Sequence, residues 1–173
     1  MKTRWVRMWM ASSLVMLAGL FLGISAHAGE KKEIAGTDKQ ARIISQTVIN
    51  VTDRPDHQLA QRVIMINTKE STDPDFQNLV VTGYEQSDSV KGSGSHKGYR
   101  IQRHENGDKS YVQYEGTHTL DVKKVGAHEL SFNGTWQATG GKGKFANITG
   151  SGTYKGRQTK EGMTSEWKGE VEY

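Results

Sequence analysis

The sequence predicts an all-β protein, a single antiparallel up-and-down barrel of about eight strands that follows a cleaved signal peptide. Apolar and polar residues alternate with a period of two over residues 110–122, 128–139 and 163–173, which is the pattern of half-buried antiparallel strands. Short turn motifs separate these segments, and helical periodicity is almost absent. Closure into a barrel would remove the exposed sheet edges that invite aggregation. An open sandwich of two sheets is the alternative.

The N-terminal residues 1–28 form the predicted signal peptide. Three cations and no acid among the first seven residues precede an apolar run over residues 8–24, and Ala26-His27-Ala28 supplies a cleavage site after Ala28. We therefore expect an exported protein, periplasmic or extracellular, without stable membrane insertion after cleavage. An uncleaved membrane anchor is the alternative, because the apolar run approaches the ~18 residues that a spanning helix needs.

The rest of the chain divides into a leader and one domain. Residues 29–39 are polar and charged with a single isoleucine, which predicts a flexible leader. Residues 40–173 are the predicted β-barrel domain, and a chain of this length fits one domain.

Composition excludes several classes of function. The chain has 23 Lys and Arg against 19 Asp and Glu, but three of the cations lie in the signal segment. The mature protein is therefore nearly neutral and lacks the clustered basic surface that nucleic acids require. There is no cysteine, which excludes disulfides and thiolate metal sites. The histidines show no metal-binding spacing, so we expect neither a metal nor a cofactor.

The strands can be assigned in chain order. β-Branched and apolar residues predict three strands over 43–51, 59–68 and 76–84. Residues 86–98 are rich in Ser and Gly, and we interpret them as a mobile loop rather than an irregular pair of strands. Residues 99–104 alternate again, and Asn106-Gly107 predicts a hairpin into the next strand. We expect the last strand, 163–173, to be able to pair with the first.

Side chains on the predicted inward faces are the candidates for a ligand site. Aromatic residues there would line a pocket in an open barrel or fill a solid core. Arg103, Glu85 and Glu115 could form a polar anchor, although a slip of one residue in register would reverse each assignment. The candidate cavity-lining residues are Tyr99, Arg103, Tyr114, His118, Phe132, Trp136, Tyr154 and Trp167.

Two of the histidines fall on predicted inward faces of neighbouring strands. His118 and His128 could approach each other there and contact a ligand, transfer a proton or share a metal ion. We favour the simpler interpretation, in which each is a hydrogen-bonded histidine of the core or rim.

Three glycine-rich motifs late in the chain resemble those of a known family. Gly134-Thr135-Trp136 is followed by Gly140-Gly141-Lys142-Gly143-Lys144-Phe145 and then by Ile148-Thr149-Gly150-Ser151-Gly152-Thr153-Tyr154. This order is similar to the late-strand signature of allene oxide cyclase-like and dirigent-like barrels. The resemblance implies an antiparallel barrel of about eight strands whose cavity often takes a small apolar or phenolic molecule. Because the motif is structural, it implies no catalytic residue.

The sequence contains no catalytic motif. We expect a protein that binds a small hydrophobic or aromatic molecule in the barrel without catalysis. The alternatives are an allene oxide cyclase-like isomerase or cyclase, and an envelope structural or interaction protein with a filled barrel. An aromatic-lined cavity of at least ~300 Å³ would favour the first two, and a strongly shifted pKa inside it would favour an enzyme.

Overall fold

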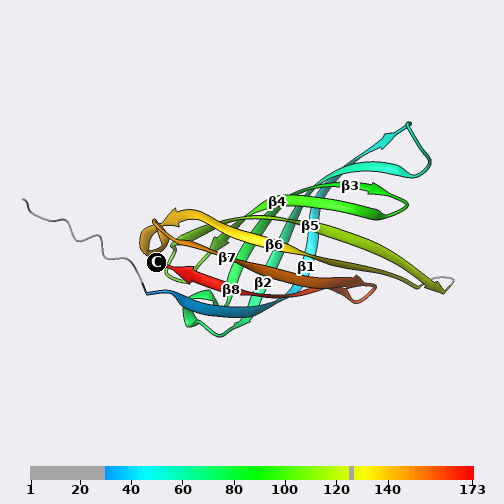
Figure 1. The fold of residues 1–173 in the computed structure, drawn as a ribbon. Coiled ribbons are helices and arrows are strands. Elements are labelled where there is room, and N and C mark those ends of the chain that lie inside the picture. Colours follow the sequence, from blue (N-terminus) through cyan, green and yellow to red (C-terminus); the bar gives the residue numbers. More distant parts are fainter. Residues whose placement is uncertain (1–29, 125–126) are drawn as a thin grey trace, which may run out of the picture.

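The computed structural model describes residues 30–124 and 127–173, over which eight antiparallel strands close into a barrel (Figure 1). Each strand pairs with the next one along the chain, and β8 pairs with β1 as expected. The predicted fold class is confirmed, whereas the predicted signal peptide lies outside the described residues. The strands are β1 (Lys32–Val51), β2 (His57–Ser71), β3 (Leu79–Val90), β4 (Ser93–Arg103), β5 (Lys109–Lys124), β6 (Ala127–Lys142), β7 (Thr149–Thr159) and β8 (Gly162–Glu172).

Two short 3₁₀ helices interrupt this order. η1 (Pro74–Phe76) lies between β2 and β3, and η2 (Gly143–Phe145) lies between β6 and β7. Within residues 30–124 and 127–173, no helix is long and apolar enough to cross a membrane.

The two-residue alternation of β5 places its predicted apolar face inside the barrel. Val112, Tyr114 and His118 are buried, while Gln113 and Glu115 are exposed. Successive side chains of a strand point to opposite faces of the sheet, so one buried position determines the face of its neighbours. The interpretation of this strand is therefore confirmed.

The predicted flexible leader, residues 29–39, is wrong for most of its length, because β1 begins at Lys32. Residues Lys32 to Asp38 pair with β8, and Ile34 and Asp38 are almost fully buried. The expected boundary at residue 40 is instead an irregularity within β1, where Gln40 has a positive φ of 57° and the register shifts. The polar composition misled the prediction because backbone hydrogen bonds to β8, which close the barrel, require no apolar side chains.

The predicted mobile loop, residues 86–98, is also wrong. β3 continues to Val90, β4 begins at Ser93, and only Lys91 and Gly92 lie between them. Both turn residues have positive φ, 53° and 76°, as the tight turns that suit twisted hairpins require. Apart from Gly92, the Ser and Gly residues that suggested a loop are strand residues, and the inward-facing Ser87 is buried.

The two ends of the barrel differ. Where β1 begins and β8 ends, Phe76 of η1 and Phe145 of η2 are buried with their rings in a T-shaped contact, 5.6 Å between centroids. Leu79, Val81 and Ile148 belong to the same buried apolar cluster. At the other end the hairpin of β1 and β2 diverges from its neighbours (Figure 1). One end of the barrel is therefore plugged by apolar side chains, and the candidate site lies beyond this plug.

Candidate functional site

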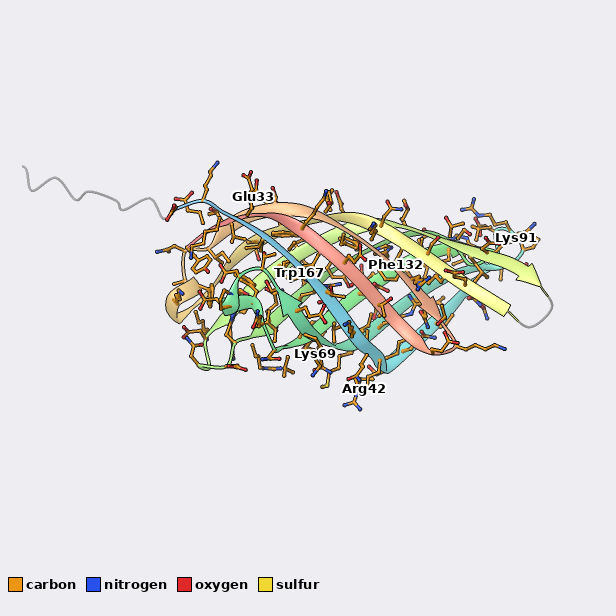
Figure 2. The ribbon with its side chains drawn as sticks, turned by 90° about the horizontal axis from the view of Figure 1, so that it is seen from below. Glu33, Arg42, Lys69, Lys91, Phe132 and Trp167 are labelled. Carbon is orange, nitrogen blue, oxygen red and sulfur yellow. The ribbon has the colours of Figure 1, made fainter. Side chains whose placement is uncertain are left out.

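A cavity of about 450 Å³ occupies the barrel between the plug and the diverging end. All eight strands contribute side chains to its wall. Figure 2 shows Trp167 nearer the plugged end and Phe132 further towards the diverging end. The volume lies within the range of about 300 to 1,000 Å³ that small-molecule sites occupy.

Apolar side chains form one part of the wall towards the diverging end, where Gln58 and Lys160 also line the cavity. Leu120 and Leu130 face each other across β5 and β6, and the next inward pair contains Phe132. Ile64 of β2 and Met163 of β8 lie on other parts of the wall. A ligand entering the barrel would therefore contact both apolar and polar side chains.

A buried carboxylate, Asp38, forms the polar floor of the cavity next to the plug. Its exposed fraction is 2%, and Arg100 Nη1 donates to its Oδ2 at 2.9 Å. A buried charge is tolerated only when it is paired and hydrogen-bonded, and Asp38 meets both conditions. Three further donors are Thr68 Oγ1 at 2.8 Å, Ser165 Oγ at 3.1 Å and Trp167 Nε1 at 3.2 Å.

A second ion pair lies on the neighbouring strands. Arg62 Nη1 donates to Glu85 Oε1 and to Ser87 Oγ, both at 3.0 Å. Arg62 Nε donates to Gln46 Oε1 at 2.7 Å, and the Tyr114 hydroxyl donates to Glu85 Oε2 at 3.3 Å. The cavity therefore holds two acids and two guanidinium groups, each acid paired with one arginine.

His96 of β4 lies among aromatic rings inside the barrel. Its ring centroid is 5.9 Å from that of Tyr154 and 6.4 Å from that of Phe132. His96 Nε2 and the Tyr154 hydroxyl are 2.6 Å apart. Burial lowers the pKa of His96 and raises the pKa of Tyr154. Both groups are therefore neutral near pH 7 and share a hydrogen bond.

His118 of β5 is the second histidine of the cavity. Its Nε2 is 2.7 Å from Ser89 Oγ, and its ring centroid is 5.7 Å from that of His96. Burial lowers the pKa of His118, so the two imidazoles are close together without charge repulsion. Neutral imidazoles can accept a proton from a bound molecule.

Four of the predicted site residues line this cavity: Tyr114, His118, Phe132 and Tyr154. Trp136 and Trp167 pack against the apolar plug and surround a void of about 40 Å³ beneath the floor. Glu85 is in the cavity, as the predicted polar anchor requires, but Glu115 is exposed on the outer face.

The prediction that Tyr99 and Arg103 line the cavity is wrong. Tyr99 is 59% exposed beside Tyr84 on the outer face, and Arg103 is exposed. The prediction assumed that the odd-numbered, more apolar residues of β4 face inward, but its even-numbered residues do so. Arg100 can face inward because Asp38 of the distant strand β1 neutralises its charge.

Sequence reasoning missed Asp38, Arg62, His96 and Arg100. Asp38 and His96 lie in the two segments that were interpreted as leader and loop. Extending the two-residue period of β5 across the Asn-Gly hairpin would have indicated His96, since it pairs with Gly116 of the inward face. His118 does not pair with His128 across β5 and β6 but with Phe132, and the side chain of His128 lies outside the described part of the protein.

No arrangement suited to a metal ion occurs among the described residues, which contain no group of three or more His, Asp or Glu side chains placed to hold one. The chain matches no family model, and no curated protein matches it. The cavity residues themselves are therefore the basis for a functional proposal.

Proposed function

We propose that this protein binds a small, largely apolar or aromatic molecule in the barrel cavity and does not transform it. The observation that carries the proposal is the cavity of about 450 Å³ with apolar and aromatic side chains along its wall and hydrogen-bonded polar groups at its floor. Small-molecule sites are typically mostly apolar with a few oriented polar groups. A cavity of this size also counts against an envelope protein with a filled barrel.

A neutral fluorescent probe tests the proposal. N-phenyl-1-naphthylamine emits strongly when it leaves water, so titration into the purified mature protein should give a saturable rise in emission. In the variant Ala41→Trp, an indole occupies the cavity, which Ala41 lines. This variant should weaken binding by about tenfold or more, equivalent to ~1.4 kcal/mol.

The variant Ala35→Trp is the matched control. Ala35 lies on the same strand but lines a groove on the outer surface with Glu70 and Lys155. Binding should be unchanged in this variant. A lack of saturable binding by the wild type, or equal loss in both variants, would contradict a ligand site inside the barrel.

A second candidate, an isomerase or cyclase, is favoured by the neutral His96 and His118 beside the Tyr154 hydroxyl. One imidazole could remove a proton from a bound substrate while the phenol donates a hydrogen bond. Mass spectrometry of cell-envelope extract, incubated with wild type or with His118→Asn protein, tests this candidate. A compound consumed only by the wild type would support it, and identical profiles would contradict it.

The resemblance to allene oxide cyclase-like and dirigent-like barrels stays a prediction, and so does export of the protein.

A further inference from the structure

The two acids of the cavity already have donors. Asp38 accepts hydrogen bonds from Thr68, Arg100, Ser165 and Trp167. Glu85 accepts hydrogen bonds from Arg62 and Tyr114. An ammonium or other donor group on a ligand would have to displace a donor at Asp38, which accepts four hydrogen bonds, whereas Glu85 accepts two. The floor of the cavity at Asp38 is therefore poorly suited to a cationic ligand.

The hydrogen-bond donors of the cavity, in contrast, do not all have an acceptor. Among the side chains that the structure describes, Arg100 Nε is the one buried nitrogen or oxygen without a hydrogen-bond partner. Leaving a buried donor unpaired is costly, and more so when the group is charged. A guanidinium carries five N–H groups in a planar fork, and Arg100 uses Nη1 for Asp38. Nε itself has almost no exposed surface, so a ligand in the cavity would meet the part of this side chain that stays exposed.

Arg100 is also placed to meet a ligand. It lines both the cavity and the small void under the floor, and its side chain keeps an exposed fraction of 16%. Its guanidinium carbon lies 5.1 Å from the centroid of the Tyr114 ring, which holds it at the edge of the aromatic cluster. Arg62 is the weaker candidate, because its Nε and Nη1 already donate to three side chains.

Building on the proposed ligand-binding function, we propose that the ligand carries a carboxylate head group and that Arg100 is the residue that binds it. The carboxylate accepts hydrogen bonds from Arg100 at the floor, in the planar geometry that guanidinium groups favour. The apolar body of the ligand then lies along Phe132, Leu120 and Leu130 towards the diverging end. The ligand class is a compact aromatic or aliphatic carboxylic acid.

Three probes that share one apolar body test the proposal: 2-naphthoate, 2-naphthalenemethanol and 2-naphthylmethylammonium. Their dissociation constants for the wild-type mature protein are measured by isothermal titration calorimetry at pH 7. Because hydrogen bonds to charged groups contribute about 1.5–3 kcal/mol, the carboxylate should bind at least about tenfold more tightly than the alcohol. The ammonium should bind most weakly.

Two arginine variants of β4 test whether Arg100 is responsible for the preference for carboxylate over alcohol. Arg100→Lys keeps the charge next to Asp38 but removes Nε and the planar fork, so the preference for carboxylate over alcohol should fall several-fold. Arg103→Lys changes an arginine on the outer face and should leave the preference unchanged. Circular dichroism establishes that each variant is folded. If Arg100→Lys does not fold, Arg62→Lys takes its place, and loss of the preference for carboxylate in that variant would overturn the assignment to Arg100.

The outcomes separate the two proposals. Equal binding of the alcohol and the carboxylate, or tighter binding of the ammonium, would overturn the carboxylate assignment and leave ligand binding in the cavity intact. A preference that survives Arg100→Lys would overturn the role of Arg100. If the neutral fluorescent probe and all three naphthyl probes fail to bind, the proposed function itself fails.

Discussion

Arg100 and Asp38 lie 62 residues apart in the chain and meet inside the barrel, with Arg100 Nη1 donating to Asp38 Oδ2 at 2.9 Å. The pair connects β4 to β1 across the interior and places a charged floor on an apolar plug. Because both charges are largely removed from water, each would be strongly destabilising without the other as its counter-ion.

We predict that Asp38→Ala destabilises the protein strongly. The substitution leaves Arg100 without its counter-ion and removes the acceptor for Thr68, Ser165 and Trp167. Breaking a buried pair on one side costs about 3–5 kcal/mol. Urea denaturation at pH 7 measures the free energy of unfolding.

The control for this prediction is Glu70→Ala. Glu70 pairs with Lys39 at 2.8 Å on the surface, and exposed pairs contribute about 0–1 kcal/mol. Similar losses in the two variants would show that Asp38 does not act as a buried partner.

We predict that Gly134→Ala disrupts the packing of Tyr154. A Cβ on Gly134 would overlap the carbonyl oxygen of Glu115 and lie 2.5 Å from the Tyr154 hydroxyl. Overpacking of this kind costs about 1–3 kcal/mol, which thermal unfolding followed by circular dichroism would detect. Gly83→Ala is the matched control, because its Cβ would lie 3.7 Å from the nearest atom, the Ile64 carbonyl oxygen. Gly83→Ala should be neutral or slightly stabilising, and a larger loss there than at Gly134 would refute the packing argument.

We predict that His57 stabilises the protein at acidic and neutral pH more than at alkaline pH. Its Nδ1 contacts Asp53 Oδ1, and its Nε2 lies 2.9 Å from Asp88 Oδ1. The hydrogen bond to Asp53 raises the pKa of His57, with help from Asp88, because two carboxylates favour the doubly protonated ring. The contribution is complete below the unfolded pKa of about 6.5 and is lost as pH rises through the higher folded pKa.

Comparison of the wild type with His57→Asn measures this contribution. The difference in free energy of unfolding should be larger at pH 6 than at pH 9. A difference that grows with pH, or a His57 pKa below 6.5 in an NMR titration, would show that the carboxylates do not hold the proton.

We predict the opposite pH dependence for the cavity histidines. Burial lowers the pKa of His96, of His118 and of His104 near the plug. The unfolded chain then binds protons more readily, so their contribution is complete above about pH 6.5 and falls as pH drops through the lowered pKa values. Denaturation between pH 5 and pH 7 should show stability falling with acid, less steeply in His118→Asn. Equal slopes in the two proteins would show that His118 is not titrating from a buried neutral state.

Much of the fold and about half of the candidate site could be predicted from the sequence. The period of two in β5 identified Tyr114 and His118 as inward residues, and the turn at Asn106-Gly107 placed the hairpin before it. These patterns are readable because strand alternation and turn geometry depend on neighbouring residues in the chain. The alternation of β4 alone predicted the wrong face, since its apolar residues lie outside the barrel, and only its pairing with β5 would have corrected this.

Local patterns are enough to predict an all-β chain whose strands can close into a barrel, because alternation and turn residues act over short stretches of sequence. Which polar residues lie inside depends instead on contacts between distant strands. Asp38 is buried in a segment with the composition of a leader, and His96 in one with the composition of a loop. A polar side chain is stable in the interior when it forms a hydrogen bond or an ion pair there. Such partners come from strands that are distant in the sequence, as Asp38 does for Arg100.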